Sequence, residues 1–95
     1  MIVMIKSAPD TPEGKRGAKI ARDTSADIVL LQNAAYFLKG GDLKDLGFLG
    51  KAYVLEDDRR LRGLRATAMN DDVRDIDYSG LVDLIAESDK VLGMF

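Results

Sequence analysis

Two adjacent pairs of acids and a group of arginines are the residues of this sequence best suited to chemistry. Asp57-Asp58 and Asp71-Asp72 could bind Mg²⁺ or share a proton. Arginines suited to phosphate or carboxylate recognition follow the first pair: Arg59, Arg60, Arg62 and Arg65. We favour a structural interpretation, with Asp57 or Asp58 capping a helix and the arginines pairing with them on a solvated face. A small metal- or nucleotide-dependent enzyme using these residues is the alternative.

The residue types that the sequence lacks narrow its chemistry further. The 95 residues include no cysteine, no histidine and no tryptophan. Without cysteine the chain has no thiolate nucleophile, no persulfide carrier and no disulfide. Without histidine it lacks the side chain that best transfers protons near neutral pH. The absence of histidine also excludes most hydrolase triads and most transition-metal sites. We therefore predict no catalytic residue, no cofactor and no metal ligand, and a protein that is not an enzyme.

The loop over residues 6–14 is the best candidate for an anion site, because it leads into a predicted helix N-terminus. It contains neither of the glycine-rich phosphate-binding motifs, and Pro9 and Pro12 contribute no amide donors. We interpret it as a capped structural turn.

Length and charge indicate a single domain over residues 1–95 with a polarised surface. The hydrophobic fraction is 46%, and no apolar run approaches the length of a membrane span, so we expect a cytoplasmic protein with no membrane contact. Residues 1–5 are apolar but lack the flanking features of a signal peptide.

Five basic residues oppose two acidic ones over residues 1–22, whereas seven acidic residues oppose one arginine over residues 71–89. A net charge of −2 gives no reason to expect binding to nucleic acid.

Short continuous apolar runs predict strands buried on both faces, as in a parallel sheet covered by helices. These runs span residues 2–5, 28–31 and 52–55, with weaker candidates at 73–76 and 91–94. Gly93 favours an edge position for the last strand. Helical segments fill the gaps, so the β-α alternation predicts an α/β three-layer sandwich with a mainly parallel sheet of about five strands.

Four helices are predicted between these strands. The first begins at Thr11-Pro12 and runs to about Asp23, with small residues on one face: Gly14, Gly17, Ala18 and Ala21. The third follows residue 55, with Leu61 and Leu64 facing inward and Gly63 near its end. A polar connection over residues 65–72 comes next. The last helix opens around residues 77–79 and directs Leu81, Leu84 and Ile85 inward.

The second predicted helix is apolar nearly all round. It begins near Asn33 and is expected to end at Gly40-Gly41. Such a helix needs more cover than the sheet provides, and a subunit interface is one source of it. We therefore predict Tyr36, Phe37 and Leu38 as interface residues.

Three stretches together resemble the DsrH/TusB family. Residues 28–35 (IVLLQNAA) resemble its strand–Gln–Asn/Asp–helix signature, and residues 51–64 resemble its K-V-Y-A-L-x-x-D-x-x-A-R-G element. Residues 75–84 (DIDYSGLVDL) resemble its I-x-Y-[ST]-x-F-V-x-L element. The resemblance implies the parallel α/β/α fold of the DsrE/DsrF/DsrH group.

In that group, TusB, TusC and TusD form a heterohexamer that relays persulfide sulfur toward 2-thiouridine at the tRNA wobble position, and DsrE, DsrF and DsrH act in sulfur oxidation. The essential cysteine belongs to the TusD/DsrE-type subunit. Some DsrH-type members also carry a cysteine, and this chain departs from them in having none. The resemblance thus implies a non-catalytic subunit of a sulfur-relay complex, partnered by DsrE/TusD-like and DsrF/TusC-like subunits. We expect no direct contact of this chain with tRNA. The alternative is a homo-oligomeric α/β interaction module without sulfur chemistry.

Overall fold

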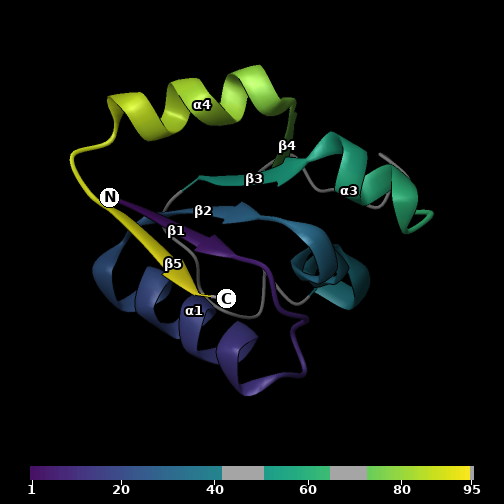
Figure 1. Cartoon of the computed structure of the whole chain (residues 1–95). Coiled ribbons are helices and arrows are strands. Elements are labelled where there is room, and N and C mark those ends of the chain that lie inside the picture. The colour runs from purple at the N-terminus through teal and green to yellow at the C-terminus, as the bar shows by residue number, and fades with distance from the viewer. Residues whose placement is uncertain (42–50, 65–72, 95) are drawn as a thin grey trace.

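The short apolar runs of the sequence form one sheet of five parallel strands, ordered β4-β3-β2-β1-β5 (Figure 1). The computed structural model of the chain describes residues 1–41, 51–64 and 73–94. Its strands are β1 (Ile2–Ile5), β2 (Asp27–Leu30), β3 (Ala52–Leu55), β4 (Val73–Ile76) and β5 (Val91–Met94). The predicted parallel sheet is confirmed, and β5 lies at an edge as Gly93 suggested.

Helices lie on both faces of this sheet, which confirms the predicted three-layer arrangement. Helix α1 (Pro12–Thr24) and the 3-10 helix η1 (Gln32–Gly41) pack on one face, and α4 (Tyr78–Glu87) packs on the other (Figure 1). The short helix α3 (Glu56–Leu61) follows β3 directly and contacts η1. No helix in the described ranges combines the length and apolar character needed to cross a bilayer.

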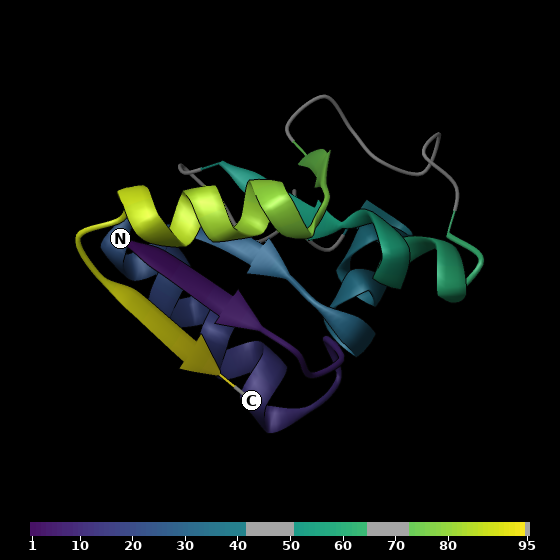
Figure 2. The ribbon, with the colours of Figure 1, turned by 45° about the horizontal axis from the view of Figure 1, so that its top comes forward.

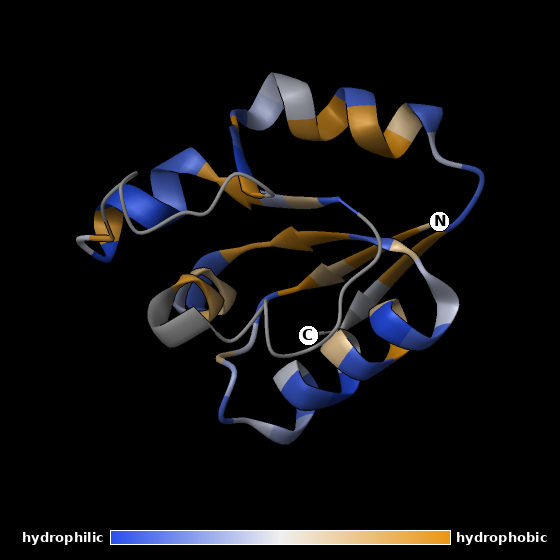
Figure 3. Cartoon of the chain, turned by 180° about the vertical axis from the view of Figure 1, so that it is seen from behind, coloured by the Kyte–Doolittle hydropathy of each residue, from blue (hydrophilic) through white to orange (hydrophobic). Residues whose placement is uncertain are grey.

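Two apolar clusters fill the space between the layers. The larger joins Val3, Ile5, Ile28 and Leu30 to the small face of α1 and to η1. The smaller joins Ile2, Val29, Leu31 and Leu55 to Leu81 of α4. Since side chains alternate along each strand, neighbouring strand residues supply opposite clusters. Strands β1 and β2 are accordingly largely orange in Figure 3, whereas α1 is hydrophilic on its outer side.

Helix α1 begins where the sequence indicated. The Thr11 hydroxyl accepts a hydrogen bond from the Gly14 amide at 3.1 Å and donates one to the Ala8 carbonyl at 2.6 Å. Gly14, Gly17, Ala18 and Ala21 are buried against the sheet, as predicted. The helix ends at Thr24, one residue later than expected, with Ser25 in the left-handed conformation.

Replacing Thr11 with alanine is expected to lower the free energy of unfolding by about 1 kcal/mol, because the first turn loses its side-chain cap. Urea denaturation measures the change. Thr24→Ala is the control, since its exposed hydroxyl only donates to the Ile20 carbonyl within the last turn. Equal stability of the two variants would contradict the capping role of Thr11.

The second helix is a 3-10 helix, Gln32–Gly41, which ends at the predicted glycine pair. Two other predicted features of the helices differ in the structure. Helix α3 begins at Glu56 with no side-chain cap, because Asp58 binds the backbone of another element. Leu61 is largely exposed at the last turn of α3, and the helix ends before Leu64, which is buried as predicted. Residues 65–72, which include Arg65, Asp71 and Asp72, lie outside the described residues.

The last helix opens at its predicted position. Asp77 caps α4 by accepting a hydrogen bond from the Gly80 amide at 2.7 Å. Leu81 is buried and Leu84 packs against the smaller cluster. Ile85 was expected to face inward but keeps 38% of its surface exposed, because α4 turns this side away from the sheet.

Candidate functional site

The carboxyl edge of the sheet brings together the ends of three neighbouring strands and the start of η1. In open parallel sheets this edge is where ligands bind. The Leu31 amide donates to the Ile5 carbonyl at 2.8 Å, and the Ala34 amide donates to the Lys6 carbonyl at 3.2 Å. Between them, Gln32 has a φ of 49°, a left-handed conformation that is unfavourable for residues other than glycine. The backbone at the end of β2 therefore turns sharply and needs support from outside.

Asp58 of α3 provides that support. One of its carboxylate oxygens accepts a hydrogen bond from the Gln32 amide, with 2.7 Å between nitrogen and oxygen. Arg62 extends the contact: its Nε donates to the Asn33 side-chain oxygen at 3.1 Å, and its Nη1 donates to the Asp58 carbonyl at 3.1 Å. These three residues, together with Gln32, form a polar cluster that holds α3 against η1.

Asp58→Ala is expected to lower the free energy of unfolding by about 1.5 kcal/mol, because the Gln32 amide loses a charged acceptor while its backbone stays strained. Asp57→Ala is the matched control, since Asp57 is the exposed neighbouring acid on the same helix. Denaturant titration of both variants gives the comparison. A loss no greater for Asp58 than for Asp57 would show that the carboxylate does not hold the turn.

The adjacent acids Asp57 and Asp58 have different surroundings in the structure. Asp58 is engaged with Gln32 and Arg62, whereas Asp57 is exposed. Within residues 1–41, 51–64 and 73–94, no three acidic side chains are placed to share a metal ion. The predicted pairing of arginines with nearby acids holds for Arg62 with Asp58, while Arg60 pairs with Glu56 one turn away.

Arg59 behaves differently from the other arginines. Only 6% of its surface is exposed, and its Nε and Nη2 donate to the two carboxylate oxygens of Asp75, each at 2.8 Å. Its Nη1 donates to the Leu64 carbonyl at 2.7 Å. The hydrogen bonds to Asp75 raise the pKa of Arg59 above its usual range, so the guanidinium stays charged. This ion pair holds α3 against β4, so Arg59 does not lie on the solvated face predicted for it.

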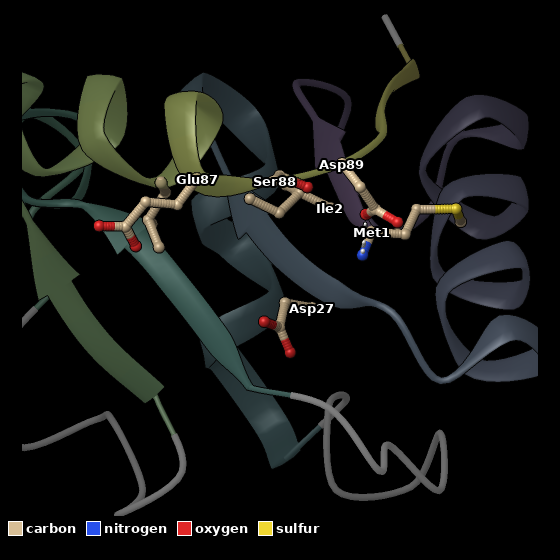
Figure 4. Close-up of a pocket in the computed structure, with 7 residues that line it drawn as sticks. Met1, Ile2, Asp27, Glu87, Ser88 and Asp89 are labelled. Atoms are coloured by element: carbon tan, nitrogen blue, oxygen red, sulfur yellow. Dashed lines mark ion pairs between the residues drawn. The ribbon is translucent and has the colours of Figure 1, made fainter.

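A pocket of about 320 Å³ lies at the opposite, amino edge of the sheet, between α4 and the starts of β1 and β2 (Figure 4). It includes Asp27, Glu87 and Asp89. Asp27 accepts a hydrogen bond from the Lys51 amide at 2.9 Å. Asp89 forms an ion pair with the Met1 amino group at 3.3 Å. The hydrogen bond from that amino group lowers the pKa of Asp89. Two of the three carboxylates thus serve the fold of the chain.

The three predicted interface residues lie on η1. Phe37 and Leu38 are 3% and 7% exposed and belong to the larger apolar cluster, while Tyr36 is partly buried beside it. The chain itself therefore supplies most of the cover for this apolar helix. Contact of these residues with another protein stays a prediction, and Tyr36 retains the most surface for it.

Comparison with known proteins supports the resemblance seen in the sequence. The structure is similar to the crystal structure of the ychN protein from E. coli, with a TM-score of 0.79, 16% identity and coverage of 97% of each chain. It is also similar to the solution structure of protein Tm0979 from Thermotoga maritima, with a TM-score of 0.67 and 28% identity, covering 95% of this chain and 97% of that one. The first likeness shows the fold alone. A comparison with curated proteins gave no significant match.

A family match adds to this likeness of fold. The family described as DsrH like protein matches residues 18–91, a range that contains all three stretches that resemble DsrH/TusB proteins. The match covers most of the sequence, from the second half of α1 to the start of β5. The chain belongs to the DsrH-like family.

Proposed function

We propose that this chain is a non-catalytic subunit of a cytoplasmic sulfur-relay complex of the TusBCD or DsrEFH kind, acting in 2-thiolation of the tRNA wobble uridine or a related sulfur transfer. The observation that carries the proposal is a DsrH-like family match over residues 18–91 in a chain without a single cysteine. A sulfur relay moves persulfide between thiols, and this chain has no thiol to take part. The chain then contributes to the relay by binding the subunits that carry the thiols.

The arrangement at the carboxyl edge of the sheet supports a role for this chain in binding other subunits. Three polar side chains there are already engaged within the chain: Asp58 with the Gln32 amide, Arg59 with Asp75, and Arg62 with Asn33. Their hydrogen bonds hold α3, η1 and β4 in place, which suits a rigid subunit that presents a fixed surface.

Co-expression tests the proposal. The chain is produced with a cysteine-bearing DsrE/TusD-like subunit and a DsrF/TusC-like subunit of the same genome, and the mixture is analysed by size-exclusion chromatography with light scattering. A discrete complex containing all three is expected. Transfer of persulfide from the partner cysteine to an acceptor protein should be faster in this complex than in a mixture lacking the chain. A chain that stays a lone monomer beside both subunits contradicts the proposal.

The same measurement on the isolated chain tests the alternative. A discrete homo-oligomer that ignores both subunits would favour an interaction module without sulfur chemistry.

A further inference from the structure

Strand β5 lies at an edge of the sheet, and its outer side has no neighbouring strand in the described part of the chain (Figure 2). On its inner side it pairs with β1 in a register that places Val91 opposite Ile2. The Ile2 amide donates to the Lys90 carbonyl at 2.9 Å, so the hydrogen-bonding groups of Ile2 point toward β5. In a parallel ladder the opposite residue directs its own backbone groups the other way, and the pattern repeats every second residue. The amides and carbonyls of Val91 and Gly93 therefore point outward, away from β1.

These outward backbone groups are available to a partner. Val91 is 38% exposed, and Gly93 is exposed as well. Across residues 1–41, 51–64 and 73–94, no hydrogen bond outside the ladder between β1 and β5 involves them. An exposed edge with unpaired amides and carbonyls is a template for another extended strand. The edge itself thus specifies the kind of contact that it makes, which is main-chain pairing with a strand.

Strand β5 also lacks the side chains that keep other edge strands from pairing. Proteins protect exposed edges with charged residues or proline. The opposite edge of this sheet, β4, has such protection, because Arg74 is exposed and Asp75 binds Arg59. The sequence of β5, VLGM, contains neither a charged residue nor a proline. Gly93 has no side chain beyond its Cα, so a second backbone can approach it closely.

The strand that fits this edge best is β5 of a second copy. An antiparallel pairing centred on Leu92 places Val91 of each copy opposite Gly93 of the other. Each such pair exchanges two hydrogen bonds, so every outward amide and carbonyl of both strands finds a partner. The Val91 side chain then covers the space that the glycine opposite leaves open. Lys90 lies opposite the position of Met94, so the pairing brings no like charges together.

The apolar residue at the centre of this pairing gains cover from it. Leu92 packs against the larger apolar cluster but is only partly buried. In the antiparallel pairing the two copies of Leu92 form a non-hydrogen-bonded pair, the kind in which side chains lie closest. Pairing of β5 with β4 of another copy would instead place an apolar strand beside a charged one. It would also repeat head to tail without closing.

We infer that β5 pairs with β5 of a second copy of this chain, in an antiparallel contact about a two-fold axis at Leu92 that joins the two sheets into one. The contact is closed, because each copy offers the same edge to the other. The inference does not depend on the proposed function. A dimer formed through β5 leaves β4 and α3, at the other side of the sheet, open to other subunits.

Sedimentation of the isolated full chain over a range of concentrations tests the inference, and the wild type is expected to form a dimer of two 10.4 kDa chains. Gly93→Pro should raise the dissociation constant at least tenfold, because it removes an outward amide from both copies. The ladder with β1 does not use that amide, so the variant should keep its fold. Val91→Lys should weaken the dimer as well, since a charge on an edge strand opposes pairing. Val82→Lys is the matched control, a change of the same kind at an exposed position of α4 that should leave the dimer intact.

Amide hydrogen exchange on the wild type gives a second measurement that needs no variant to fold. The Val91 and Gly93 amides should exchange at least tenfold more slowly at concentrations where the dimer forms than after dilution. The Leu92 amide faces β1 and is protected at both concentrations. A wild type that stays monomeric overturns the inference, as does a dimer in which the Val91 and Gly93 amides exchange at the monomer's rate. A dimer that Val82→Lys disperses and Gly93→Pro leaves intact assigns the contact to α4 and also overturns it.

Discussion

Asp75→Ala is expected to lower the free energy of unfolding by about 3 kcal/mol, because it leaves the Arg59 guanidinium buried without its carboxylate. Arg59 is almost fully covered, whereas the Asp75 side chain keeps 26% of its surface exposed, which places the loss at the lower end of the range for a broken buried ion pair. Arg59 would still donate to the Leu64 carbonyl, so the end of α3 should keep one anchor. Chemical denaturation followed by circular dichroism measures the loss.

The neighbouring ion pair supplies a control for this prediction. Arg60 and Glu56 pair along the exposed side of α3, and such pairs contribute at most about 1 kcal/mol. Arg60→Ala should therefore leave the chain nearly as stable as the wild type. If Asp75→Ala costs no more than Arg60→Ala, then the contact between α3 and β4 does not depend on the charge pair.

The sheet could be predicted from the sequence because its signals are local. The runs at residues 2–5 and 52–55 are apolar throughout, and only strands covered on both faces need that pattern. Thr11-Pro12 and Asp77 mark helix starts through their own side chains and backbones, and both cap the helices where expected. The order of the strands has no such local signal, since it depends on which strands pair after the crossovers form.

The clamp between Arg59 and Asp75 could not be predicted from spacing alone. The two residues are sixteen positions apart and on different elements. An arginine among other charged residues on a short helix is typical of an exposed face, and only the placement of β4 beside β3 buries this one. The signal that could have found it is Asp75 itself, an acid inside a short strand, where a partly buried carboxylate requires a partner.

The same reasoning explains the errors at α3. Asp57 and Asp58 follow a strand and are typical of a helix cap. The Asp58 carboxylate instead accepts a hydrogen bond from the amide of the strained Gln32, and α3 starts without a side-chain cap. Leu61 was expected to face inward from its spacing to Leu64, but α3 ends at Leu61, and Gly63 then turns the chain with a φ of 67°. The helical spacing does not continue through that turn.

Gly14→Ala is expected to destabilise the chain by about 3 kcal/mol, the upper part of the usual range for overpacking. A Cβ at this position would lie 2.1 Å from the Ala8 carbonyl oxygen, far inside any allowed contact. That oxygen cannot move away easily, because both the amide and the hydroxyl of Thr11 donate to it. Relief would require α1 to shift away from the end of β1, against which its small face is buried.

Gly80 provides a closely matched control, because it occupies the same position in α4 that Gly14 occupies in α1. Each glycine lies three residues after its capping residue and donates its amide to that residue's side chain. A Cβ on Gly80 would meet the Asp77 carboxylate at 3.3 Å, a side chain that can rotate away. Gly80→Ala should therefore change the free energy of unfolding by no more than about 1 kcal/mol, with the helix preference of alanine offsetting the tighter contact. Thermal unfolding of the two variants compares them directly. Similar melting temperatures would mean that α1 does not need its close approach to the loop after β1, and that the small face of this helix is not what positions it on the sheet.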